Sequence, residues 1–281
     1  MPSQKDPDLQ SDSPNVRRYR PSFWISASVL LHILGLIAVC IHAAIWPYVI
    51  GLLLLDHCIL TLFGLWPRSS GLGPNAVRIP ARENPCVYLT LDDGPNPEVT
   101  PKVLDLLDQY ACSCTFFVIG NHARRYPDLL REILRRGHAI GNHSDVHGHA
   151  FALHSVRGYE KELQAAQQTI FEITGVSPRY FRAPFGFRSP LLEPALCKVG
   201  LHLVSWTRRG FDTRCQCPGT ILKRLTQNLA AGDILLLHDG PFGHTLGGKP
   251  MVLEVLPMLL DELRSRGLTS AVLPNAFLAE N

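Results

Sequence analysis

Long uncharged runs near the start of the chain predict a pair of membrane helices. Residues 23–46 contain no charged side chain, and residues 48–66 contain a single one, Asp56. A helix as long as the first run rises roughly 36 Å, enough to cross the ~30 Å apolar core of a bilayer with some tilt. Residues 1–22, which precede these runs, are polar. We therefore expect a polar tail followed by two hydrophobic, membrane-associated helices within residues 23–66.

Asp56 and the flanking arginines qualify this prediction. An aspartate at mid-depth costs roughly 2.5–3.5 kcal/mol on insertion scales. Pairing of Asp56 with the adjacent His57 could offset this cost, and a re-entrant hairpin would also suit both residues. A signal peptide, for which the apolar run is too long, and a buried hairpin of a soluble domain are the alternatives. Arginines occur before and after the pair but not between its runs: Arg17, Arg18, Arg20, Arg68, Arg78 and Arg82. The positive-inside rule then places both ends of the pair in the cytoplasm.

Beyond residue 66 the pattern changes to alternating strands and helices. Residues 67–85, rich in Gly, Pro and Arg, predict a linker. The predicted strands are 86–91, 115–119, 138–141, 179–182, 202–206, 233–238 and 269–273. The predicted helices are 103–110 with an N-cap at Thr100, 128–136, 155–174, 190–199, 221–230 and 252–266. Parallel strands need helical crossovers, so this alternation predicts an α/β fold for residues 86–281, as an open sheet or a barrel.

Polar residues follow five of the predicted strands at the same end. They are Asp92, Asp93, His143, His147, Arg182, Asp212 and His238. Because functional groups gather at the carboxyl ends of parallel strands, we expect these side chains to converge on one rim. The i, i+4 spacing would place His143 and His147 on one face of a helical turn. Two imidazoles and a carboxylate form a normal ligand set for a divalent metal with open coordination positions.

Each motif also has a plainer interpretation when taken alone. Residues 92–95 (Asp-Asp-Gly-Pro) are typical of a turn, and the pair His143 and His147 is typical of a solvated helix start. Their joint placement at strand ends favours the metal site. His149 and His154 lie nearby but are set aside as ligands, since His149 does not fit the helical face of His147.

Four motifs resemble, in order and spacing, those of the polysaccharide deacetylase family, carbohydrate esterase family 4. They are Thr90-Leu91-Asp92-Asp93-Gly94-Pro95, His143-Ser144-x-x-His147, Arg182-Ala183-Pro184-Phe185-Gly186 and Leu235-Leu236-Leu237-His238. The resemblance covers roughly residues 86–275 and leaves the first 85 residues outside it. It implies a distorted (β/α) barrel of about seven strands that removes N-acetyl groups from amino sugars.

The resemblance also implies a role for each motif residue. The implied ligands of a divalent metal, usually Zn²⁺ or a similar ion such as Co²⁺, are Asp93, His143 and His147. Asp92 would be the general base, paired with Arg182. His238 would be the general acid, held and tuned by Asp212. The implied substrate-binding residues are Pro184, Phe185, Gly186 and Leu236, the last beside the acetyl methyl. The chain departs from the family at two positions commonly held by Asp and Trp, which are here Arg209 and Thr213.

Amino-acid composition argues against two other classes of protein. Hydrophobic residues make up 46% and charged residues 18% of the chain, which excludes a disordered protein. A net charge of +3 is too small to argue for nucleic acid as a partner. We expect a metal-dependent hydrolase that removes N-acetyl groups from a chitooligosaccharide, peptidoglycan or a related glycan at a bacterial inner membrane. The positive-inside rule places the catalytic domain on the cytoplasmic face of the membrane, whereas the polymer substrates of the family lie outside the cell. The sequence therefore leaves open on which face of the membrane the domain lies.

Two alternative functions remain at this point. The first is a deformylase or deacylase of a lipid-linked sugar, whose phosphate would meet arginines on the rim. Those arginines are Arg182, Arg188, Arg208, Arg209 and Arg214. The second is a non-catalytic carbohydrate-binding relative, against which the intact Asp92, Asp93 and His238 argue.

Overall fold

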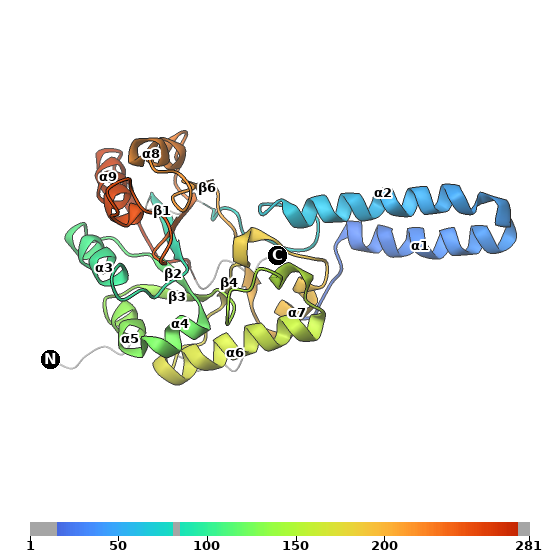
Figure 1. The fold of residues 1–281 in the computed structure, drawn as a ribbon, viewed down its shortest axis with the longest axis horizontal. Helices are drawn as coiled ribbons and strands as arrows, with labels where there is room; N and C mark the ends of the chain where they lie inside the picture. The colour runs from blue at the N-terminus through green and yellow to red at the C-terminus, as the bar shows by residue number, and fades with distance from the viewer. Residues whose placement is uncertain (1–15, 81–84, 275–281) are drawn as a thin grey trace.

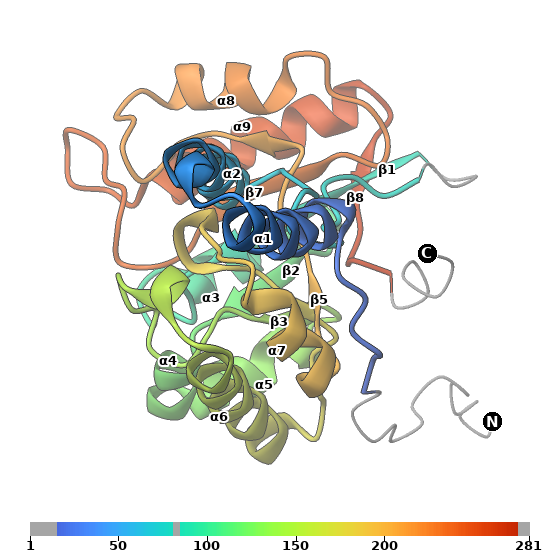
Figure 2. The same ribbon diagram turned by 90° about the vertical axis from the view of Figure 1, so that its right-hand side faces the viewer.

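The computed structural model describes residues 16–80 and 85–274, so most of the expected polar tail, Arg82 and the last seven residues lie outside the described part. Two long helices, α1 (Phe23–Ile41) and α2 (Trp46–Leu65), project side by side from an α/β domain (Figure 1). Seen along these helices, the other helices surround a central sheet (Figure 2).

A parallel sheet forms the centre of the domain, in the order β5-β4-β3-β2-β1-β7-β6, with β8 paired beside β1. Its strands are β1 (Cys86–Asp92), β2 (Thr115–Val118), β3 (Ala139–Asn142), β4 (Tyr180–Phe181), β5 (His202–Leu203), β6 (Arg208–Arg209), β7 (Ile234–His238) and β8 (Thr269–Ser270). The seven strands on this path form the distorted parallel barrel, with β8 as an eighth strand off the path, and the predicted α/β class is confirmed. Strand β6 was not predicted, because two arginines carry no apolar strand signal.

Helices cover the outer face of this sheet. They are α3 (Thr100–Gln109), α4 (Gly120–Arg125), α5 (Pro127–Arg135), α6 (Val156–Thr174), α7 (Leu192–Val199), α8 (Pro218–Thr226) and α9 (Met251–Ser265). The predicted helix 155–174 begins one residue later than predicted, at Val156, because Ser155 is its N-cap and its hydroxyl accepts from the Gly158 N–H. The predicted N-cap at Thr100 is wrong: Val99 takes that position, and the Thr100 hydroxyl bonds to Asp239 instead.

The alternation of side chains in β1 separates two apolar layers. Val87, Leu89 and Leu91 face the helices and belong to the largest core cluster. Tyr88 faces the barrel interior and packs in a second cluster with Leu236. Since successive side chains of a strand point to opposite faces, Thr90 and Asp92 also face the interior.

The helical hairpin of α1 and α2 is mostly exposed. Both helices are long and apolar enough to cross a membrane, yet only 11% and 6% of their most apolar windows are buried. A hairpin in the core of a soluble domain would be largely buried, so that alternative does not fit. Asp56 lies in α2, where its Oδ2 accepts a 2.6 Å hydrogen bond from the Ser28 hydroxyl. The adjacent His57 is farther away, with Nδ1 at 3.8 Å.

The described part of the predicted linker, residues 67–80, is packed against the domain, and we call it the strap. It buries Leu72 and Ile79 and forms an isolated β-bridge between Ala76 and Val204. At its start, the Pro67 carbonyl accepts a 2.6 Å hydrogen bond from the Ser205 hydroxyl, just past β5. The strap therefore holds the end of α2 against the carboxyl side of the sheet.

Candidate metal centre and active site

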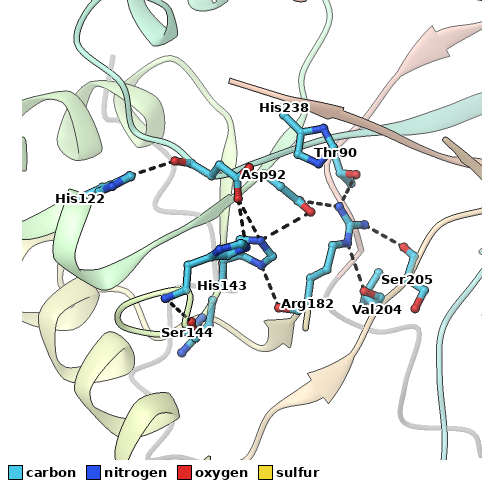
Figure 3. A network of polar contacts seen from close by, with 12 residues as sticks. Thr90, Asp92, His122, His143, Ser144, Arg182, Val204, Ser205 and His238 are labelled. Carbon is cyan, nitrogen blue, oxygen red and sulfur yellow. Dashed lines mark hydrogen bonds and ion pairs between the residues drawn. The ribbon is translucent and has the colours of Figure 1, made fainter. Parts of the chain in front are cut away.

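The carboxyl ends of β1, β7 and β3, at the same edge of the parallel sheet, bring the predicted polar residues together (Figure 3). Asp92 ends β1 and is the register partner of His238, which ends β7. His143 directly follows β3. The shared direction of these parallel strands thus turns distant sequence positions into neighbours at one rim.

Asp93, His143 and His147 form a compact three-residue cluster. Asp93 Oδ1 lies 3.3 Å from His143 Nε2 and 3.4 Å from His147 Nε2. The three ligand atoms all lie within 4.8 Å of one another. This carboxylate oxygen is buried and has no hydrogen-bond partner in the described part of the chain. An unpaired buried oxygen facing two ring nitrogens fits a divalent cation, which would bind all three atoms.

The tautomer of His143 also fits a metal ligand. Its Nδ1 lies 2.9 Å from the carbonyl oxygen of Arg182. A carbonyl only accepts, so Nδ1 carries a proton and Nε2 is the ring nitrogen that faces Asp93 and would bind a metal. Metal-binding histidines commonly donate their other ring N–H to a carbonyl in this way.

The loop that carries both histidines is not the helical turn that their spacing predicts. Ser144 and His147 adopt positive φ angles of 64° and 54°. Side-chain bonds stabilise this shape: Asn142 Oδ1 accepts from the Ser144 N–H at 2.9 Å, and Ser144 Oγ accepts from the His147 N–H at 3.0 Å. Asn and Ser compete with helix formation through such local bonds. The loop, rather than a helix face, makes the imidazoles converge.

The electrostatic environment favours the metal-binding forms of two of these groups. Burial opposes ionisation of Asp93, but the close contact with His143 and the charges of the His238 and His147 imidazoles outweigh it and hold the pKa of Asp93 below its ordinary value. Burial, together with repulsion from His143, lowers the pKa of His147 to about 4. A carboxylate and a neutral imidazole are the forms that bind a metal.

Arg182 fixes the position of Asp92. Its Nη1 donates to Asp92 Oδ1 and to Thr90 Oγ1, both at 2.7 Å. Its Nη2 and Nε donate to the carbonyls of Ser205 and Val204. The buried guanidinium of Arg182 therefore has a structural role, since its hydrogen bonds hold Asp92 in place. It leaves Asp92 Oδ2 on the side of the metal cluster, 3.9 Å from His143 Nε2.

Asp212 holds His238 in the same manner from the other side. Its Oδ1 lies 3.0 Å from His238 Nδ1, and its Oδ2 accepts from the His238 backbone N–H at 2.8 Å. Burial alone would lower the pKa of His238, but the charge and hydrogen bond of Asp212 outweigh it and raise the pKa to about 9. His238 is thus protonated at neutral pH, with Nε2 as its free ring nitrogen.

The predicted substrate-binding residues lie beside this centre with unequal access. Phe185 is 38% exposed, and its ring lies 4.7 Å from that of His147. Pro184 and Gly186 are buried next to it, and Leu236 is only 1% exposed inside the barrel. Phe185 is thus the accessible member of this group.

The structure adds contacts that sequence reasoning missed. His122, which the sequence motifs do not include, has its Nδ1 3.0 Å from the Asp93 carbonyl oxygen (Figure 3). Thr90 bonds to Arg182 as described above, and its place two residues before Asp92 on the same strand face is a signal that could have identified it. His149 stacks on Phe185 and stays outside the metal cluster.

A parallel barrel with a carboxylate–imidazole metal centre at its mouth, beside a buried carboxylate and a protonated histidine, defines a class of metal-dependent hydrolases. The polysaccharide deacetylase family model matches residues 80–204. The chitooligosaccharide deacetylase of Azorhizobium caulinodans is 35% identical over 197 residues, which span 67% of this chain and 92% of that protein. The chain belongs to the polysaccharide deacetylase family.

Other relatives support the same family assignment. A peptidoglycan-N-acetylglucosamine deacetylase of Bacillus cereus is 29% identical over 194 residues, spanning 68% of each chain. Among solved structures, a family 4 carbohydrate esterase from Streptomyces lividans in complex with acetate has a TM-score of 0.60. It is 29% identical, and the match covers 67% of this chain and 92% of that one. The family match begins at residue 80, so the hairpin lies outside it.

Proposed function

We propose that this protein is a membrane-anchored, metal-dependent N-deacetylase of an amino-sugar glycan. The observation that carries the proposal is the joint geometry of the Asp93–His143–His147 cluster, the Arg182-backed Asp92 and the Asp212-backed His238. Relatives named as chitooligosaccharide and peptidoglycan N-acetylglucosamine deacetylases support an N-acetylated glycan as substrate. The hydrolysis of its acetamide yields acetate and a free amine.

The metal is the first requirement of this reaction. Asp93, His143 and His147 would hold a divalent ion, and Zn²⁺ suits their oxygen and nitrogen donors, with Co²⁺ as a close substitute. When bound, it would polarise the amide carbonyl and acidify a water molecule.

Asp92 and His238 would move the protons. The free Oδ2 of Asp92 faces the cluster, so it would accept the proton of the attacking water as general base. His238, protonated and held by Asp212, would donate its Nε2 proton to the departing amine. Arg182 supports this by keeping Asp92 in place, since its four hydrogen bonds anchor the guanidinium to β1 and to the chain after β5.

The hairpin would anchor the domain at the bilayer surface. Trp24, Trp46 and Trp66 lie near the helix ends, where interfacial aromatics are common. Arg17, Arg18, Arg20, Arg68 and Arg78 flank the pair, which supports both ends on the cytoplasmic side of an inner membrane.

Acetate release from an N-acetylglucosamine oligomer tests this function. We expect the purified full-length protein to release acetate, to lose this activity after chelator treatment and to regain it with added Zn²⁺ or Co²⁺. The free amine produced should equal the acetate. Full activity in metal-stripped protein would contradict the proposal, as would product that appears without acetate.

Asp212→Asn tests the general-acid role through pH. Without the Asp212 charge, burial dominates and the pKa of His238 should fall from about 9 to at or below its ordinary ~6.5. The alkaline limb of the kcat/KM profile should therefore move to lower pH by about two units or more. An activated aryl acetate needs no proton on its leaving group, so its hydrolysis should be affected far less.

The same change has a stability signature. A raised pKa in the folded state means that the His238–Asp212 pair stabilises the wild type fully below roughly pH 6.5. This contribution is lost as the pH rises to about 9. The free energy of unfolding should therefore decline over this window in the wild type and less in Asp212→Asn. An unmoved alkaline limb in the variant would assign the proton transfer to another group.

A further inference from the structure

Arginines on the rim differ sharply in how their donors are used. Arg182 donates its hydrogen bonds to Asp92 and to neighbouring groups. Arg188 bonds to the Ser69 carbonyl of the strap, and Arg208 donates to Asp233 at 2.8 Å. Arg209 has no hydrogen bond or ion pair within residues 16–80 and 85–274, and its Nε is buried without a partner. The Arg209 guanidinium is thus a charged group without a hydrogen-bond or ion-pair partner among the described residues.

The sheet register places Arg209 on the interior face beneath the active site. Arg209 is the partner of Leu236, which is in turn the partner of Thr90. Asp92 lies two residues beyond Thr90, on the same face of β1. The carboxylates of Asp92, Asp93 and Asp212 also act on Arg209: burial lowers its pKa and these charges oppose the shift. The guanidinium is therefore within electrostatic range of the reacting groups.

Two aromatic rings hold Arg209 in place. Its Cζ lies 5.2 Å from the ring centroid of Trp206 and 5.0 Å from that of Phe211. Such stacking orients a guanidinium while leaving its N–H fork free. Phe211 is 44% exposed, so this stack reaches the solvent-accessible mouth. A fixed, unpaired fork is suited to bidentate binding of a phosphate or carboxylate.

The strap brings the bilayer end of α2 to the same place. A Cβ on Gly186 would contact both Pro67 of the strap and Trp206, the ring under Arg209. Arg68 donates to the Thr207 carbonyl, two residues before Arg209. With the hairpin in a membrane, Arg209 would lie close to the headgroup level, where the phosphate of a lipid-linked sugar is located.

We propose that Arg209 binds the phosphate of a phosphate-linked N-acetylated amino sugar, next to the acetamide that the centre hydrolyses. This deepens the proposed function and rests on it. Phosphate is the shared chemistry of a soluble sugar phosphate and a polyprenyl-phosphate-linked sugar. The position of the strap favours the lipid-linked form.

Substrate comparison with Arg209→Gln tests this binding. A charge-assisted bidentate contact is worth roughly 10–100-fold, so kcat/KM on polyprenyl-phosphate-linked N-acetylglucosamine should fall by about that factor, mainly through KM. Activity on the neutral N-acetylglucosamine tetramer should stay within about twofold. Arg131→Gln, at an arginine of α5 that is 54% exposed and is not one of the rim arginines, is the control and should leave both activities unchanged. Equal losses on both substrates would overturn the proposal.

Binding gives a readout that does not depend on turnover. Calorimetric titration of the zinc-loaded protein with N-acetylglucosamine 1-phosphate should show a weaker affinity in Arg209→Gln than in the wild type and Arg131→Gln. Equal affinities would refute phosphate recognition by Arg209. If no sugar yields acetate but the affinity difference persists, the deacetylase function fails and the phosphate site stands. Equal kcat/KM of the wild type on soluble and lipid-linked phosphates would support the phosphate site and reject the lipid as its source.

Discussion

Asp92→Asn is expected to lower kcat by roughly 10²–10⁴-fold, the usual contribution of a general base, while metal binding persists. The amide has the shape of the carboxylate and its oxygen still accepts from Arg182 Nη1, but it cannot take a proton from water. The cluster atoms of Asp93, His143 and His147 are unchanged. Steady-state kinetics and metal content per protein, measured on the same preparation, check both halves of this prediction.

The stability of this variant needs its own measurement. Removing the Asp92 charge leaves Arg182 buried without its counter-charge, which costs roughly 3–5 kcal/mol in comparable buried pairs. Rates should therefore be expressed per folded, metal-loaded molecule. Asp128→Asn, at a site that is 96% exposed, is the control and should behave as the wild type. A folded Asp92→Asn protein with kcat within tenfold of the wild type would assign the base to another residue.

His143→Gln is expected to abolish metal binding at micromolar metal and, with it, acetate release. Loss of an outer partner already weakens metal affinity by roughly 10–100-fold, and His143 supplies a direct donor atom. Its Nδ1–H also anchors the loop to the Arg182 carbonyl. Competition with a fluorescent zinc chelator measures the affinity, and acetate assays at saturating metal follow the activity.

His149→Gln is the matched control, since His149 belongs to the same loop, is exposed and lies outside the metal cluster. It should retain wild-type affinity and at most alter substrate binding through Phe185. Unchanged zinc affinity in His143→Gln would remove His143 from the ligand set. An equal loss in His149→Gln would show that the loop, rather than the ligand, had been disturbed.

The order of helices and strands could be predicted from the sequence because each long apolar run follows either the helical or the strand periodicity. The predicted strands 86–91 and 233–238 became β1 and β7, and the Ser155 cap and Gly175 mark the two ends of α6. Two short polar elements escaped prediction. Strand β6 is only Arg208–Arg209, and α4 is a polar segment of six residues. Tertiary pairing, not local pattern, creates both.

The candidate site was predictable in its membership but not in its geometry. Parallel strand ends predict that Asp93 and His143 meet. The left-handed conformations of Ser144 and His147, which bring the second imidazole in, depend on hydrogen bonds across the loop that no periodicity reveals. Arg209 was one of five candidate arginines, and only the register with Leu236 and the contact with Trp206 distinguish it.

The packed strap has a consequence for how this enzyme would meet its substrate. A flexible tether would let the catalytic domain sweep a volume of solvent, whereas residues 67–80 are hydrogen-bonded and bridged to the barrel. With α1 and α2 embedded, the catalytic centre would stay at a constant height above the lipid plane. Encounters would then follow two-dimensional lateral diffusion, and a substrate carried in the same leaflet would arrive already at the right depth.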